Sequence, residues 1–151
     1  MDTKLLRRIK ELNVFLLFLL ICFGCDPVDD KLAIVNQSDE ELFFVTSPHS
    51  DLSKLYQEGL DQHGVEVKYT NYVEEVEPNA TYRPTHFGSG NAWERYINQV
   101  CEGGKLRIYT FDLDTLKKYN WKEVIENDLY LKKVELSVDE LEKMNWKVTL
   151  P

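Results

Sequence analysis

A short, uninterrupted apolar run near the N-terminus constrains this chain more than any other feature. Ten consecutive apolar residues occupy positions 14–23 of the 151, after a basic start and before Gly24. As a helix this run is about 15 Å long, whereas the hydrocarbon core of a bilayer is about 30 Å thick. Because the run is apolar on every side, it also differs from an amphipathic core helix. The basic start, the short apolar segment and the small residue together predict a cleaved secretory signal peptide over residues 1–24.

The residues at the end of this leader predict a covalent lipid. The segment Ile21-Cys22-Phe23-Gly24-Cys25 resembles the lipobox of bacterial lipoproteins, in which the cysteine after a small residue is the acceptor. The resemblance implies that the Cys25 thiol receives a diacylglycerol group and that the leader is cleaved before Cys25. It also implies that the new amine takes a further acyl chain such as palmitate. The alternative is that Cys25 is an ordinary cysteine of a secreted protein.

The number of cysteines agrees with lipidation. Of the three, Cys22 leaves with the leader and Cys25 carries the lipid, so Cys101 alone remains and no internal disulfide is expected. Burial of an acyl chain contributes about 0.8 kcal/mol per CH₂, so two or three chains hold a protein durably on a membrane whereas one binds marginally. We therefore expect the protein to contact a membrane through its N-terminal lipid.

Residues 25–31 predict a short acidic tether that is solvated. Asp26, Asp29 and Asp30 follow Cys25 there, with one proline and no apolar periodicity. The tract resembles the acidic export signal of surface-exposed lipoproteins in Bacteroides-type bacteria. In enterobacteria, by contrast, an Asp directly after the cysteine favours retention in the inner membrane, and a third interpretation is that these acids only keep a linker soluble. We expect a location in the cell envelope, and the export-like tract favours the outer membrane and surface exposure.

The charge of the chain excludes one class of partner. Lys and Arg total 18 against 26 Asp and Glu, which gives a net charge of −8, and loss of the leader makes it −10. Binding a nucleic acid requires basic side chains that neutralise phosphates, so no nucleic-acid partner is expected. An acidic surface is also repelled by anionic lipid, which leaves the acyl chains rather than a basic patch to contact the membrane.

Residues 32–151 predict one globular α+β domain, since a hydrophobic content of 43% argues against disorder. Apolar alternation predicts about six strands in a mainly antiparallel sheet, and a mixed sheet is the alternative because residues 133–146 are long enough for a crossover. The first two strands are expected to form a hairpin, and residues 42–45, apolar on both faces, to be covered on both sides. A bulge is expected at 132–133. The candidate segments for these strands are residues 31–36, 41–46, 65–74, 81–83, 105–112, 129–136 and 146–150.

Several short helices are expected between these strands. The strongest signal covers residues 92–101, where apolar side chains follow helical spacing. Asn91 and Glu94 have the spacing of a capping box before it, and Gly103 stands where a left-handed cap belongs. The other expected helices begin after Ser50, at residues 115–119, at 121–127 behind Asn120 and at 138–144 behind Ser137.

The tryptophans and the last cysteine are expected in the core. Helical or strand periodicity accounts for Trp93, Trp121 and Trp146 as packed residues, and stacking of these rings on sugars is the alternative. Cys101 lies on the same helical stripe as Trp93, so we expect an inert packed thiol.

Histidine and serine motifs do not predict catalysis. His49, His63 and His86 lack the spacing of metal ligands, so no metal ion or other cofactor is expected. Gly88-Ser89-Gly90 lacks the glycines two residues either side of the serine that a nucleophile elbow requires. We expect it to form a turn into the helix that follows.

An acidic motif after an expected strand also falls short of a catalytic pattern. In Asp112-Leu113-Asp114-Thr115 the threonine comes one place too early for the phosphotransferring Asp-x-Asp-x-Thr motif, and Asp114 is expected to cap the following helix. We therefore expect no catalytic residues and no enzyme. The alternative is a small envelope hydrolase whose fold joins His86 with Asp112 or Glu94.

Several stretches together resemble a group of small cell-envelope lipoproteins of Bacteroides-type bacteria whose function is uncharacterised. The resemblance covers most of the chain and implies a location rather than a mechanism. We expect a non-enzymatic, lipid-anchored module that binds or supports a partner, either a protein or a glycan of the envelope. Besides the lipobox, the stretches are Lys31-Leu-Ala-Ile-Val-Asn-Gln-Ser, Ala92-Trp-Glu-Arg-Tyr-Ile-Asn, Phe111-Asp-Leu-Asp-Thr-Leu and Leu141-Glu-Lys-Met-Asn-Trp-Lys-Val-Thr-Leu-Pro.

Overall fold

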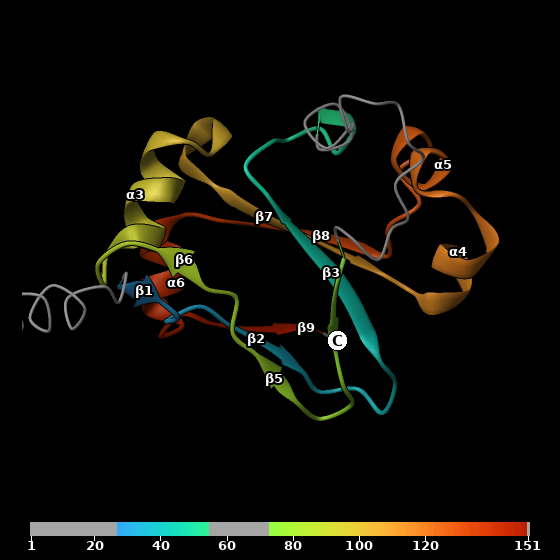
Figure 1. The fold of residues 1–151 in the computed structure, drawn as a ribbon, viewed down its shortest axis with the longest axis horizontal. Coiled ribbons are helices and arrows are strands. Elements are labelled where there is room, and N and C mark those ends of the chain that lie inside the picture. The colour runs from blue at the N-terminus through green and yellow to red at the C-terminus, as the bar shows by residue number, and fades with distance from the viewer. Residues whose placement is uncertain (1–26, 55–72, 151) are drawn as a thin grey trace, which may run out of the picture.

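A computed structural model describes residues 27–54 and 73–150, and it confirms the α+β class (Figure 1). The helices in these ranges are α3 (Ala92–Gln99), α4 (Leu113–Lys118), α5 (Trp121–Glu126) and α6 (Val138–Lys143), with a 3₁₀ turn at Glu102–Gly104. The strands are β1 (Val28–Asp29), β2 (Ala33–Asn36), β3 (Leu42–Ser47), β4 (Glu74–Val76), β5 (Thr81–Tyr82), β6 (His86–Phe87), β7 (Leu106–Phe111), β8 (Lys132–Leu136) and β9 (Lys147–Leu150).

The described strands divide among three sheets, so the single sheet expected from the sequence is wrong. Two strands pair in the order β1-β6, three in the order β5-β2-β9 and four in the order β4-β3-β7-β8. The pairing of β2 with β9 is parallel, and the other pairings in the described ranges are antiparallel. Helix α6 carries the chain from β8 in the four-stranded sheet to β9 in the three-stranded sheet, so residues 133–146 connect two sheets and do not form a crossover within one. Mixed strand directions occur in the three-stranded sheet, where β2 pairs antiparallel with β5 and parallel with β9.

The four-stranded sheet is covered on both faces, as residues 42–45 predict. Leu42 and Phe44 pack into one hydrophobic core, and Phe43 and Val45 pack into the other. Successive side chains of a strand point to opposite faces, so a continuous apolar run requires a cover on each side.

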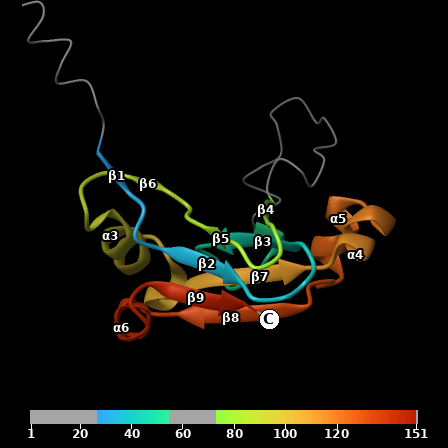
Figure 2. The same cartoon turned by 90° about the horizontal axis from the view of Figure 1, so that it is seen from below.

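Different helices cover the two hydrophobic cores. Figure 2 shows α3 and α6 at one end of the fold and α4 and α5 at the other. The first core lies among the four-stranded sheet, the three-stranded sheet, α3 and α6, and it includes Leu32, Ile34, Trp93, Ile97, Ile108, Leu141 and Val148. The second core lies between the four-stranded sheet and the α4–α5 end, and it includes Leu52, Tyr109, Phe111, Leu116, Trp121, Val124 and Ile125.

The hairpin expected between β2 and β3 is wrong, because the two strands belong to different sheets. Asn36 is fully buried at the end of β2, and its Nδ2 donates hydrogen bonds to the carbonyl oxygens of Glu40, Val76 and Glu77 at 2.7, 3.0 and 3.2 Å. Its Oδ1 accepts a hydrogen bond from the amide of Ser38 at 2.9 Å. The Asn36 side chain thus satisfies backbone groups of Ser38 and Glu40, in the turn that leads from β2 to β3, and the carbonyl groups of residues 76–77 beside it.

Among α4, α5 and α6, two helix starts agree with the sequence and one differs. Asn120 and Ser137 each form a complete capping box, with Glu123 and Glu140 respectively. Helix α4 is capped by Asp112 instead of Asp114, because the Asp112 carboxylate accepts a hydrogen bond from the Thr115 amide at 2.6 Å.

Two further expectations are tested near the ends of strands. The expected bulge at 132–133 is absent, since Lys132–Leu136 pairs with Leu106–Thr110 in one unbroken register. Gly103 has the expected left-handed φ of 65°, which costs a glycine little, but it does not cap α3: the helix ends at Gln99 with Val100 as its C-cap, and Gly103 lies within the 3₁₀ turn that follows. The helix expected after Ser50 lies outside the described residues beyond Lys54. The strand expected over 65–74 lies outside them too, except at its end, where Glu74 begins β4.

The two-sided burial of β3 gives a stability prediction. Replacing either Phe43 or Phe44 with Ala should lower the free energy of unfolding by about 3–5 kcal/mol, because each substitution leaves a cavity in one of the two cores. The matched control is Phe87→Ala. The Phe87 side chain is 78% exposed, so its removal should change the free energy of unfolding by less than about 0.5 kcal/mol. Urea unfolding measures all three, and a small loss at Phe43 or Phe44 would contradict the two-core arrangement.

Candidate functional site

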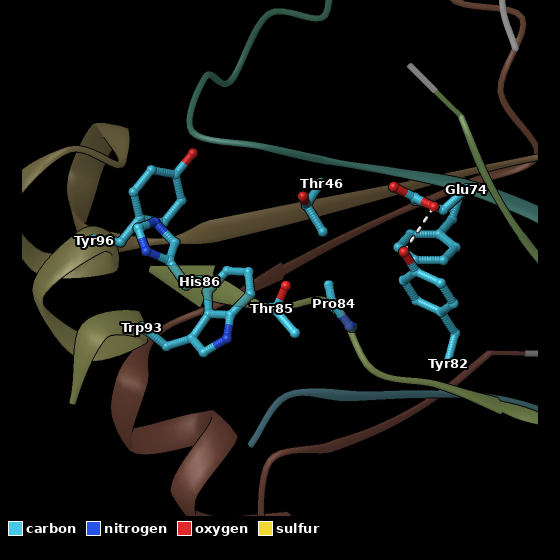
Figure 3. A pocket seen from close by; sticks show the side chains of 9 residues that line it. Thr46, Glu74, Tyr82, Pro84, Thr85, His86, Trp93 and Tyr96 are labelled. Carbon is cyan, nitrogen blue, oxygen red and sulfur yellow. Dashed lines mark hydrogen bonds between the residues drawn. The ribbon is translucent and has the colours of Figure 1, made fainter. Parts of the chain in front are cut away.

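A pocket of about 310 Å³ lies where α3 approaches strands of all three sheets (Figure 3). Its size is near the lower limit for small-molecule sites, which are about 300–1,000 Å³. Both aromatic and polar side chains contribute to its wall. The described residues that line it are Phe44, Thr46, Glu74, Tyr82, Pro84, Thr85, His86, Trp93 and Tyr96.

Three rings from α3 and β6 form one wall of the pocket. Figure 3 shows His86, Trp93 and Tyr96 gathered on one side. The imidazole of His86 lies 5.2 Å from the Trp93 ring in an edge-to-face arrangement and 4.7 Å from the Tyr96 ring at a tilt. Trp93 and Tyr96 lie one helical turn apart on α3, so their rings project from the same face, 6.0 Å between centroids. Mutual packing holds these rings in place.

A tyrosine and a glutamate form the opposite wall. The Tyr82 hydroxyl donates a hydrogen bond of 2.7 Å to Oε2 of Glu74, as Figure 3 shows. Burial raises the pKa of Tyr82 to about 12, and the hydrogen bond to the Glu74 carboxylate adds to this effect. The phenol therefore keeps its proton near neutral pH. Its ring packs edge-to-face on Phe44 at 5.6 Å, which fixes the hydroxyl toward Glu74.

This arrangement suits a ligand with an apolar face and hydroxyl groups. Aromatic rings offer flat apolar surface, while the Glu74 carboxylate has acceptor capacity beyond the one bond from Tyr82. Thr46 and Thr85 add hydroxyls that both donate and accept. The described lining contains no Lys or Arg, so its chemistry favours a neutral ligand over an anionic one.

The fold does not bring together the residues of the expected hydrolase alternative. His86 lines the pocket, but the described lining includes neither Asp112 nor Glu94. Glu94 instead accepts hydrogen bonds from Nζ of Lys31 at 2.7 and 2.8 Å. Asp112 caps α4 near a second, more acidic hollow of about 680 Å³ that is lined also by Asp39, Glu40, Glu41 and Asp114.

The other histidine that the structure describes has a structural contact. Nδ1 of His49 lies 3.2 Å from Oε1 of Glu102, whose carboxylate also binds Lys54 and the amide and hydroxyl of Ser50. His63 lies outside the described residues. Among the residues that are described, no group of three or more His, Cys, Asp or Glu side chains is arranged to hold a metal ion.

Asp29 belongs to the fold, which corrects the expectation of a solvated tether over residues 25–31. Its side chain is 3% exposed, and Oδ2 accepts a hydrogen bond from the backbone amide of Trp93 at 3.2 Å. Its carbonyl oxygen accepts another from the Trp93 indole at 3.0 Å, and Lys31 lies 3.3 Å from its carboxylate. The chain is therefore attached to the domain from β1 onward.

Asp29 provides the N-terminal cap of α3 that the sequence predicts at Asn91. Asn91 precedes α3, but its side chain does not cap the helix and instead binds Ser89 and Arg95. The first amides of a helix need acceptors, and a carboxylate there also interacts favourably with the helix dipole. Asp29 supplies that acceptor from a strand distant in sequence.

Of the remaining residues of the expected lipidation and export signals, the structure describes Asp30 but not Cys25 or Asp26. Asp30 is exposed, and its carbonyl oxygen accepts a hydrogen bond from Arg83 at 3.2 Å. Cys25 and Asp26 lie outside the described residues. Within the described ranges, no helix combines the length and apolar character needed to cross a bilayer.

The expected core residues are confirmed. Trp93, Trp121 and Trp146 are all buried. Cys101 is buried as well, and burial raises the pKa of its thiol to about 11, so it remains protonated near neutral pH and is a poor nucleophile. Trp93 has a second role, because it also lines the pocket.

Comparison of the chain with protein-family models, with curated proteins and with solved structures found no match. The functional interpretation therefore depends on the residues described above.

Sequence reasoning missed the Tyr82–Glu74 side of the pocket. Tyr82 and Glu74 are eight residues apart and lie in different sheets, so no local spacing brings them together. The available signal was weak: Tyr82, Pro84 and His86 alternate along an extended stretch, which places them on one face. Trp93 and Tyr96 were found by their helical spacing, but as core residues only.

The buried carboxylate of Asp29 gives a second prediction. Asp29→Ala should lower the free energy of unfolding by about 1–3 kcal/mol, because the buried Trp93 amide loses its acceptor. Asp30→Ala, the matched control in the same acidic tract, should change it by less than about 0.5 kcal/mol because that side chain is exposed. Chemical denaturation compares the two, and equal effects would show that Asp29 does not cap α3.

Proposed function

We propose that this protein is a non-enzymatic, lipid-anchored module of the cell envelope that binds one neutral sugar ring of a glycan. The observation that carries the proposal is the pocket itself, with the rings of His86, Trp93 and Tyr96 on one side and the Tyr82–Glu74 pair on the other. Residues 1–24 serve as the signal peptide, and Cys25 carries the acyl chains.

The sequence supports the anchored location. The basic and apolar leader, the lipobox-like segment ending at Cys25 and the acidic residues behind it match the layout of an exported lipoprotein. By the resemblance to Bacteroides-type lipoproteins, the domain is held on the outer membrane and faces the cell surface. Acyl chains on Cys25 supply the attachment, which an acidic domain cannot obtain from a basic patch.

A glycan suits the pocket better than a protein partner does. A sugar ring presents an apolar face of C–H groups that packs on aromatic rings, and its hydroxyls match the acceptors and donors of Glu74, Thr46 and Thr85. A stable protein interface buries about 800 Å² on each partner, with a continuous contact area rather than one small hollow.

The carboxylate content of the pocket favours binding over hydrolysis. Most glycoside hydrolases place two carboxyl groups about 5–10 Å apart around the bond that breaks. The described lining contributes one carboxylate, Glu74, and that group already accepts a hydrogen bond from Tyr82. Glu74 is thus arranged to hold a hydroxyl.

Binding by the pocket leads to a third prediction. Tyr96→Ala should weaken glycan binding about 3- to 10-fold, because an aromatic stacking contact contributes about 0.5–1.5 kcal/mol. Tyr82→Phe should weaken it as well, because the hydroxyl that orders Glu74 is lost. Tyr119→Ala is the matched control, since Tyr119 packs beside the second core, away from the pocket.

The experiment is a screen of neutral envelope and dietary glycans on an array, followed by calorimetric titration of the best ligand. Equal affinity of all the variants would contradict binding in this pocket. Release of a shorter glycan during incubation would identify a hydrolase and overturn the non-enzymatic assignment. If glycans fail and an envelope protein is retained by wild type but not by Tyr96→Ala, the partner is a protein.

The anchor gives a fourth prediction. Cys25→Ala should leave the protein unprocessed or released, because the substitution removes the thiol that accepts the lipid. Fractionation of cells into membrane and soluble material measures this outcome. Cys101→Ala is the matched control and should stay with the membrane, since Cys101 is buried in the domain. Unchanged membrane partition of Cys25→Ala would refute lipidation at this residue.

A further inference from the structure

The ribbon of β1 and β6 carries two exposed apolar side chains that neither core uses. Phe87 is 78% exposed and Val28 is 49% exposed. The two residues are directly opposite in the antiparallel pairing, and opposite side chains of a pair share one face with Cβ atoms about 4.5–5.5 Å apart. They form one continuous apolar surface, which we call the Val28–Phe87 patch.

The other face of the same ribbon is fixed to the domain. Asp29 and His86 also stand opposite each other, and both point inward, Asp29 to the amide of Trp93 and His86 to the rings of the pocket wall. Neighbouring residues of a strand point to opposite faces, so the Val28–Phe87 patch faces away from the domain. Figures 1 and 2 show the ribbon at the outer edge of the fold beside α3.

The position of the patch in the chain indicates what covers it. Val28 is the third residue after Cys25. Three residues reach at most about 11 Å when fully extended. Because β1 is held by Asp29, there is no longer spacer between the proposed acyl chains and the domain. A domain held this closely presents the β1–β6 ribbon to the lipid surface.

The local charges fit contact with neutral lipid. Near the ribbon, Lys31 is bound to Asp29 and Glu94, and Arg95 is bound to Ser89 and Asn91. The charge of Lys31 is thus paired with two carboxylates, whereas Arg95 is hydrogen-bonded to neutral groups and remains a single cation. The Val28–Phe87 patch therefore offers an apolar surface to the lipid, and the described residues around it form no cationic cluster that would require anionic headgroups.

We propose that Val28 and Phe87 insert into the headgroup region of the bilayer and seat the domain on the membrane in one orientation. This inference rests on the proposed lipidation of Cys25. It adds a second, non-covalent contact and fixes which side of the domain faces the lipid: the β1–β6 ribbon lies at the membrane, and the α4–α5 end points away from it (Figure 2).

The test uses the full chain, expressed with its leader, purified from membranes and reconstituted into phosphatidylcholine vesicles with or without brominated acyl chains, which quench nearby tryptophans. Phe87→Trp reports on the patch. Leu131→Trp is the matched control, because Leu131 is 63% exposed and lies beside α4 at the other end of the fold. The wild-type signal of the buried tryptophans is subtracted, and the intact mass of each sample records its acylation.

We expect brominated lipid to reduce the added emission of Phe87→Trp and to leave that of Leu131→Trp unchanged, at both low and high salt. An acylated sample without quenching at position 87 overturns the membrane contact while the anchor stands. Equal quenching at both positions overturns the fixed orientation. A sample without acyl mass overturns the anchor and this inference with it.

A second copy of the chain is the competing occupant of the patch. Sedimentation of Cys25→Ala protein, without vesicles, measures it. A dimer that Phe87→Ser converts to monomer would assign the patch to self-association and overturn the membrane contact. A monomer at all concentrations is the result expected here.

Discussion

The hydrogen bond from the Trp93 amide to the Asp29 carboxylate is the interaction on which this arrangement depends. It satisfies a backbone amide at the start of α3, attaches β1 to the domain, and fixes Trp93, which lines the pocket. A buried carboxylate is costly unless it is paired, and here Lys31 and two groups of Trp93 surround the residue. The pocket wall and the exposed β1–β6 ribbon consequently lie beside each other, and the proposed anchor at Cys25 is four residues before Asp29.

This proximity relates the two proposed contacts of the protein. His86 and Phe87 are neighbours in β6, one facing the pocket and the other facing outward. If the proposed membrane contact through Phe87 forms, the pocket lies close to the membrane, where the proposed glycan ligand would be attached to or lie on that surface. A long flexible tether would instead allow the pocket to face any direction.

The sequence predicts local features of the fold well and non-local ones poorly. The continuous apolar run at residues 42–45 predicted a strand covered on both faces, and two capping boxes placed helix starts, because these signals act within a few residues. The expected hairpin failed because the partners of Asn36 at Val76 and Glu77 are about 40 residues away. Likewise, Asp29 looked solvated by composition, since its partner Trp93 is 64 residues further along. The helical spacing of Trp93 predicted a core residue and not a pocket wall, and the Tyr82–Glu74 contact forms only where two sheets meet.

The most direct test of the account is hydrogen exchange at Trp93, measured by NMR on the backbone amide and the indole N–H. The account predicts that both are protected nearly as strongly as the amide of Ile108 in the middle of β7. In Asp29→Ala the Trp93 amide should lose that protection while Ile108 keeps it. Rapid exchange of the Trp93 amide in the wild-type protein would contradict the account, because the segment behind Cys25 would then not be fixed to the fold.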